Sequence, residues 1–174
     1  GRTGVQMRLA DRMSRRDLTS QLWLIEDAVN RNDVSDALRH YDTALRVSES
    51  VQTMLYPVLT DALAEPAIRA KFTPYVEEAP AWMASFLRFA VTNSDDRRNI
   101  ALLARDAGGF PEARPYATLD SELMVGLGAQ GHWQAAIEHL RRTNDHADEL
   151  LTTLSMSERS TDPAFAPFVW RPLV

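Results

Sequence analysis

Apolar residues recur along most of this chain at steps of three or four positions, the spacing that places them on one face of an α-helix. The first two runs are Leu18, Leu22, Ile25 and Val29, then Val34, Leu38, Tyr41 and Leu45. The pattern of a strand, alternating β-branched and aromatic residues bounded by turn residues, is not found. The periodicity therefore predicts an all-α protein.

Turn residues divide the periodic segments into successive pairs of helices. The expected helices cover residues 18–29, 34–45, 51–63, a segment from Pro66 onward, 80–93, 96–107, 118–130, 132–143 and 145–157. Ser94 or Asp95 is expected to cap the helix over 96–107, and Gly108 with Gly109 to end it. Pro57 and Pro74 fall inside helical patterns and are expected to kink or shorten their helices.

Residues of the segment 29–50 pair without a gap with residues of the segment 127–148 at an offset of 99 positions, or three periods of 33. The aligned pairs include Asn32 and Gly131, Ala37 and Ala136, Leu38 and Ile137, and His40 and His139. The residue at Asn32 and Gly131 must tolerate a positive φ where the first helix ends. The small alanine allows the two helices to approach closely, and a period of 33 would repeat it at Ala70 and Ala104.

The turn residue, the alanine and the bulky residue one turn later resemble the tetratricopeptide repeat, which has a period of about 34 residues. The resemblance spans about 18–150 and is strongest at its two ends, since the segments around Ala70 and Ala104 lack the rest of the motif. It implies a right-handed superhelical solenoid of about four antiparallel helical hairpins over residues 1–158. Residues 159–174 are expected to form a non-helical apolar tail, which either folds back or begins a further domain; we favour the second alternative.

In this family the first helix of each hairpin lines a concave face that usually holds a peptide or another protein. Transferred residue by residue, the concave positions are Thr19, Leu22, Glu26, Val29 and Asn30 in the first repeat, and Ser121, Val125, Gly128 and Ala129 in the last. The resemblance therefore implies a scaffold that binds protein or peptide and performs no catalysis. The alternatives are an accessory or positioning domain of a larger envelope or carbohydrate-related enzyme, and a homo-oligomer that associates through its ends.

The hexapeptide GLGAQG, residues 126–131, matches the GxGxxG string of dinucleotide-binding folds. That chemistry requires a strand before the glycines and a helix after them. Here the preceding segment has Leu119, Leu123 and Leu127 at helical spacing, and Gly131 aligns with the turn residue Asn32. We therefore interpret the string as a helix and its terminal turn, and we expect no nucleotide or other cofactor.

Composition narrows the remaining functions. The 174 residues carry a net charge of −5, which argues against nucleic-acid binding. The chain has no cysteine, so thiolate metal sites, disulfides and cysteine nucleophiles are excluded. No apolar run is long enough for a membrane span, so we expect no membrane insertion. The chain opens in what reads as the middle of an amphipathic helix, which indicates an excised fragment and leaves the compartment, cytoplasmic or periplasmic, open.

The residues that could carry chemistry have simpler interpretations. His132, His139 and His146 are spaced by seven, but no HExxH is present and RRTND should break the helix between the last two, so no metal site is expected. His40 and His139 share a repeat position, which points to a common packing role. No acidic residue is embedded in an apolar stretch, and neither GxSxG nor a phosphate-binding loop occurs. Trp23 and Trp82 are expected in the core, and Trp133 between hairpins.

Overall fold

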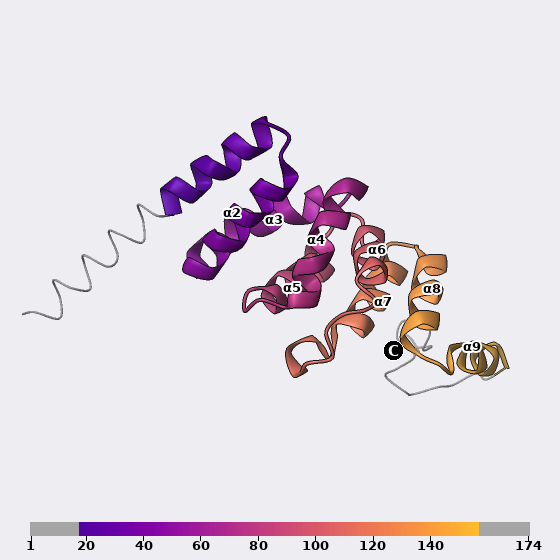
Figure 1. The fold of residues 1–174 in the computed structure, drawn as a ribbon. Coiled ribbons are helices and arrows are strands. Elements are labelled where there is room, and N and C mark those ends of the chain that lie inside the picture. Colours follow the sequence, from indigo (N-terminus) through magenta and orange to yellow (C-terminus); the bar gives the residue numbers. More distant parts are fainter. Residues whose placement is uncertain (1–17, 157–174) are drawn as a thin grey trace, which may run out of the picture. The chain divides into compact units, whose positions relative to one another are not determined.

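The computed structural model describes residues 18–156, with side chains to residue 152, and over this range it contains nine α-helices and no strand (Figure 1). The first helix covers residues 18–30. The others are α2 Val34–Val47, α3 Gln52–Ala62, α4 Pro66–Glu78, α5 Met83–Asn93, α6 Arg98–Asp106, α7 Leu119–Ala129, α8 Trp133–Thr143 and α9 Ala147–Met156. The all-α prediction is confirmed, and each expected helix is present within a few residues of its predicted bounds.

Pro57 and Pro74 do not shorten their helices as expected. α3 continues past Pro57 to Ala62, and α4 continues past Pro74 to Glu78. A proline inside a helix removes one N–H donor from the ladder, yet the residues after it still find carbonyl partners. In α4 the hydrogen bonds extend to Ala79, whose N–H donates to the carbonyl of Tyr75 at 3.1 Å.

The turns of the first and last hairpins have the same backbone geometry. Asn32 and Gly131 have φ values of 58° and 79°. The residue after each turn donates its N–H back to the end of the first helix, from Asp33 to the carbonyl of Ala28 at 2.9 Å and from His132 to that of Leu127 at 2.8 Å. Each of these bonds ends the first helix with a residue in the left-handed conformation. The positive φ expected at Asn32 and Gly131 is therefore confirmed.

The two middle hairpins end their first helices differently, with an arginine that lies in the second helix or directly before it. Arg69 Nη1 donates to the carbonyls of Leu63 at 2.7 Å and Ala64 at 3.1 Å. Arg97 Nε donates to the carbonyl of Val91 at 2.6 Å, and its Nη2 to that of Thr92 at 2.5 Å. In both cases the acceptors lie six and five residues before the arginine. The guanidinium thus satisfies carbonyls that the helix end leaves without an internal partner.

The repeated alanines are only partly borne out. Ala37, Ala104 and Ala136 are buried, whereas Ala70 is exposed. The fourth residue of the second helix, Ala37 in α2 and Ala136 in α8, is the buried Arg69 in α4 and the half-buried Ala101 in α6, so neither Ala70 nor Ala104 takes this position. The predicted register of the second repeat is therefore one residue off, because an arginine replaces the expected alanine.

The ends of α6 were predicted half correctly. Gly108 and Gly109 have φ values of 76° and 128°, and Gly109 donates to the carbonyl of Ala104 at 2.8 Å, so the two glycines end the helix as expected. Ser94 and Asp95 do not cap it, because the N-cap position is Arg97, which makes no side-chain capping bond. The carbonyls of Ser94 and Asp95 accept hydrogen bonds from the side chain of Gln130. Asp96 Oδ1 accepts from the N–H of Arg98 at 3.0 Å.

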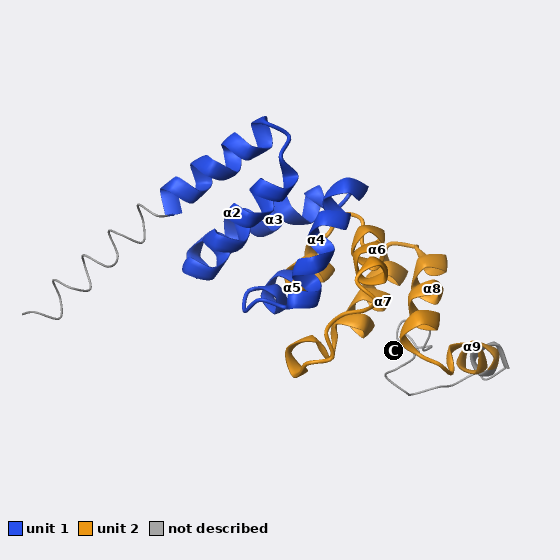
Figure 2. Ribbon diagram, viewed as in Figure 1, with its two compact units in different colours: residues 1–86 blue, residues 87–174 orange. Residues whose placement is uncertain are grey.

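The chain forms two compact units, residues 1–86 and 87–174 (Figure 2). In unit 1, α2 packs on α4, and the rings of Tyr56, Phe72, Trp82 and Phe86 form a cluster with centroids 5.2 to 6.2 Å apart. In unit 2, α7 packs on α8 and α6, and Met124, Leu140 and Ala147 join α7, α8 and α9 in one apolar cluster. The expected tail over 159–174 and the helical pattern before residue 18 lie outside the described residues.

Candidate functional site

The nine residues proposed for a concave face lie on two first helices, 18–30 and α7, in different units. On the helix 18–30, Thr19, Glu26, Val29 and Asn30 are exposed and Leu22 is half-buried. On α7, Val125 and Ala129 are exposed, Ser121 is half-buried and Gly128 is buried. The set on the helix 18–30 therefore offers more surface to a partner than the set on α7.

Two exposed apolar residues of α3 occupy the positions that correspond to Leu22 and Glu26. α2 and α4 begin 32 residues apart, at Val34 and Pro66. The same offset relates Leu22 to Met54 and Glu26 to Val58, which are 54% and 52% exposed. We call Leu22, Glu26, Val29, Asn30, Met54 and Val58 the first-helix set.

The tryptophans are distributed differently from the prediction. Trp82 is buried, and its Nε1 donates to Asp42 Oδ1 at 2.9 Å. Trp23, expected in the core, is 63% exposed because Ile25 and Ala28 take the inward face of the helix 18–30. Trp133 is 47% exposed at the start of α8, so it is only half covered by its neighbours.

The hexapeptide GLGAQG forms the end of α7 and the turn after it. Gly126 faces the third hairpin so closely that a Cβ added there would overlap Cδ and Nε of Arg97. Gln130 Oε1 accepts from the N–H of Arg97 at 3.0 Å, and its Nε2 donates to the carbonyls of Ser94 and Asp95, each at 3.0 Å. This segment therefore holds the α5–α6 linker in place, and the helix before it differs from the strand that a dinucleotide site requires.

His40 and His139 have equivalent partners 19 residues earlier in the chain. His40 Nδ1 lies 2.8 Å from Gln21 Oε1, and His139 Nε2 lies 2.8 Å from Asp120 Oδ1. Gln21 and Asp120 are themselves 99 positions apart, so the two histidines each join the second helix of a hairpin to the first. This supports the shared packing role that the alignment suggested. Within the described residues, no three or more His, Asp or Glu side chains are grouped so that they could hold a metal ion.

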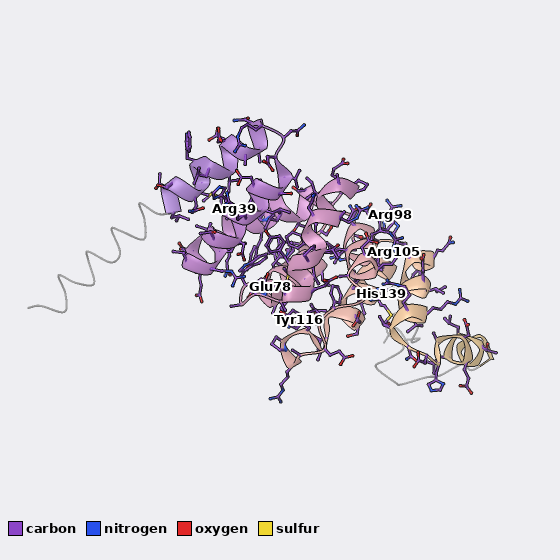
Figure 3. The ribbon with its side chains drawn as sticks, in the orientation of Figure 1. Arg39, Glu78, Arg98, Arg105, Tyr116 and His139 are labelled. Carbon is purple, nitrogen blue, oxygen red and sulfur yellow. The ribbon has the colours of Figure 1, made fainter. Side chains whose placement is uncertain are left out.

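A pocket of about 380 Å³ lies between α2 and α4, and Glu78, which is labelled in Figure 3, is one of the residues that line it. Arg46 pairs with Asp42 at 2.8 Å and with Glu78 at 3.0 Å. Burial raises the pKa of Tyr75, and the negative charges of Asp42 and Glu78 raise it further. The two carboxylates thus have partners within the chain, and their evident role is to hold α2, α4 and Trp82 together.

Comparisons with known proteins add no family to this description. No family model matches the chain, and neither the curated proteins nor the solved structures contain a match. None of the helices in the described part of the chain combines the length and apolar character needed to cross a membrane.

Proposed function

We propose that this protein is a helical-repeat scaffold of the tetratricopeptide type, which binds an extended or helical segment of another protein through the first helices of its hairpins. The observation that carries the proposal is the exposure of Val29, Met54 and Val58 on the helix 18–30 and α3. These residues lie at positions that face a bound chain in the family. Large apolar side chains left in water at corresponding positions are more typical of an interaction surface than of scattered surface residues.

Polar groups accompany the apolar ones. Glu26 and Asn30 lie one helical turn apart on the exposed side of the helix 18–30, and Asp61 is exposed one turn after Val58 on α3. Such a mixture fits a peptide site, in which apolar contacts supply affinity and a few polar groups fix register. In a tetratricopeptide stack, consecutive first helices are neighbours, so the set would form one groove.

A peptide library displayed on phage and selected against the protein tests this proposal. The selected peptide is synthesised, and its Kd is measured by fluorescence anisotropy with wild type, Val58→Lys and Val47→Lys. Val58 and Val47 are each 52% exposed, but Val47 ends the second helix α2. We expect Val58→Lys to weaken binding about tenfold or more, because a buried interface position would have to accommodate a charge.

Val47→Lys is expected to leave the Kd unchanged, which makes it the matched control. A second variant, Glu26→Ala with Asn30→Ala, is expected to weaken binding through the polar positions. If the selected peptides bind both test variants as well as they bind wild type, the first helices are not the binding surface and the proposal fails.

A further inference from the structure

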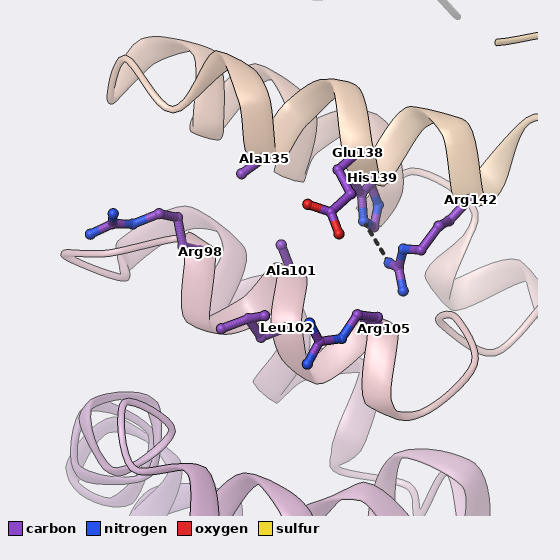
Figure 4. Close-up of a pocket in the computed structure, with 8 residues that line it drawn as sticks. All are labelled: Arg98, Ala101, Leu102, Arg105, Ala135, Glu138, His139 and Arg142. Atoms are coloured by element: carbon purple, nitrogen blue, oxygen red, sulfur yellow. Dashed lines mark hydrogen bonds between the residues drawn. The ribbon is translucent and has the colours of Figure 1, made fainter. Parts of the chain in front are cut away.

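A second pocket, of about 180 Å³, lies in unit 2 between α6 and α8, the second helices of their hairpins (Figure 4). Ala101, Leu102 and Ala135 supply an apolar floor. Arg105 of α6 and Arg142 of α8 lie toward one end of the space between the helices, with the Arg105 side chain running back along α6 beside Leu102, and Arg98 lies at the opposite end. The pocket contains no member of the first-helix set, so a ligand bound in it would be independent of the proposed peptide groove.

Arg142 is held by a histidine instead of a carboxylate. Its Nη2 lies 3.2 Å from His139 Nδ1. A guanidinium can only donate, so Nδ1 must accept and His139 must carry its proton on Nε2, which then donates to Asp120 Oδ1 at 2.8 Å. His139 is 1% exposed, so its ring is a fixed support. In the described part of the chain, no carboxylate lies within 4.0 Å of the Arg142 guanidinium.

Among the described residues, Arg142 thus has no ion pair of its own, although carboxylates lie near enough to act on its charge. Partial burial lowers the pKa of Arg142 and the nearby charge of Arg105 lowers it further, while the charges of Glu138, Asp120 and Asp106 raise it. Arg105 has one carboxylate partner, Asp106, and both Nε and Nη2 of Arg105 contact the single oxygen Oδ1, at 2.9 and 2.8 Å. Two guanidiniums on facing helices therefore repel each other, and an anion placed between them would relieve that repulsion.

We propose that this pocket binds a carboxylate carried on a short apolar chain, with the carboxylate between Arg105 and Arg142 and the chain against Ala101, Leu102 and Ala135. A planar carboxylate matches the fork of N–H donors on a guanidinium. The volume equals that of about six water molecules, which suits a group with a few carbon atoms. Glu138 also lines the pocket, and its charge disfavours a ligand with a second carboxylate.

The ligand chemistry has two possible sources, a free small acid or an acidic side chain of a partner protein. NMR titrations of the Arg Nε–H resonances distinguish them with four probes: butyrate, butyramide, inorganic phosphate and an acetylated tripeptide with one central glutamate. We expect butyrate to shift the Arg105 and Arg142 resonances in a saturable way, with Kd on the order of 1 mM for an open site. Butyramide, which lacks the charge, and phosphate, which lacks the chain, should bind more weakly.

Three variants define the site. Arg142→Gln should weaken butyrate binding about tenfold or more through loss of charged hydrogen bonds, whereas Glu138→Gln should strengthen it. Arg98→Gln is the matched control, because Arg98 pairs with Asp96 at 2.7 Å and lies at the far end; it should change the Kd less than about twofold. Circular dichroism melting of each variant checks that the fold persists.

The titration with the glutamate tripeptide shows whether the bound carboxylate belongs to a small acid or to a partner protein. If the glutamate tripeptide binds at least as tightly as butyrate, the ligand group belongs to a partner protein; if butyrate alone binds, it belongs to a small acid, and both results support the carboxylate site. The proposal is overturned if butyrate and butyramide behave alike, if phosphate binds more tightly than butyrate, or if Arg98→Gln and Arg142→Gln have equal effects.

Discussion

Gly126 and Arg97 are a pair of residues in which the absence of one side chain makes room for the other. Arg97 passes over Gly126 to reach the carbonyls of Val91 and Thr92 at the end of α5. A glycine inside a helix costs about 1 kcal/mol relative to alanine. The two hydrogen bonds from a charged group are worth more than that cost, which explains a glycine in the middle of α7.

This explanation predicts that the effect of Gly126→Ala on the free energy of unfolding changes sign when Arg97 is removed. In the wild type, Gly126→Ala should lower the free energy of unfolding, because the added methyl group displaces Arg97 from its carbonyls. In an Arg97→Ala background the same substitution should raise the free energy of unfolding by about 1 kcal/mol, since only helix propensity then remains. Urea denaturation of the four proteins measures both effects. An effect of the same sign and size in the two backgrounds would show that the close approach does not matter.

At the scale of the elements, some helix ends can be predicted from the sequence and others cannot. Asn32 and Gly131 could be recognised because few residue types tolerate a positive φ, so the backbone demands them. Arg69 and Arg97 could not, because an arginine near the start of a helix looks like an ordinary surface residue. Only the fold shows that their guanidiniums turn back to carbonyls five and six residues earlier.

Arg69 also explains why the α3 part of the candidate site, Met54 and Val58, could not be predicted from the sequence. With Ala70 taken as the repeat alanine, the positions on α3 that match Leu22 and Glu26 would be Leu55 and Leu59, which are 4% and 2% exposed. With Arg69 in that place they are Met54 and Val58, which are exposed. A shift of one residue rotates a helix by about 100°, enough to exchange an outward face for an inward one. Local sequence pattern therefore located the helices but not the surface of α3.

Tyr56 joins α3 to the turn before α5 and should make the protein sensitive to alkali. Its hydroxyl donates to the carbonyl of Trp82 at 3.1 Å, and burial raises its pKa to about 12. In the unfolded chain a tyrosine titrates near its ordinary value of about 10. The neutral form is thus favoured in the folded state, so this contribution is complete below about pH 10 and is lost as pH rises toward 12.

We expect the free energy of unfolding to fall by about 1.4 kcal/mol per pH unit in this window on account of Tyr56 alone. Urea denaturation between pH 8 and the alkaline limit of the assay, on wild type and Tyr56→Phe, measures the difference. The variant is less stable at pH 8, because the carbonyl of Trp82 loses one of its two donors and keeps the N–H of Phe86, but its stability should decline less steeply above pH 10. Parallel pH profiles for the two proteins would contradict the assignment to Tyr56.

At the scale of the whole molecule, two compact units share one helix, since α5 carries the last residues of unit 1 and the first of unit 2. The buried contacts described next nonetheless lie within one unit each. The buried ring of Phe72 contacts Tyr75, Trp82 and Phe86, all in unit 1. Leu123, which is fully buried, belongs to α7, and α7 packs on α6 and α8 in unit 2.

Phe72→Ala and Leu123→Ala should therefore have reciprocal effects on native-state hydrogen exchange. Each removes a buried side chain and should cost about 3 kcal/mol. Because stability is local where contacts are local, Phe72→Ala should speed exchange of the amides in α2 and α4 while those of α7 and α8 keep most of their protection. Leu123→Ala should do the reverse. If either variant lowers protection equally in all helices, α5 couples the units into one cooperative structure, and a partner bound to one unit would then stabilise the other.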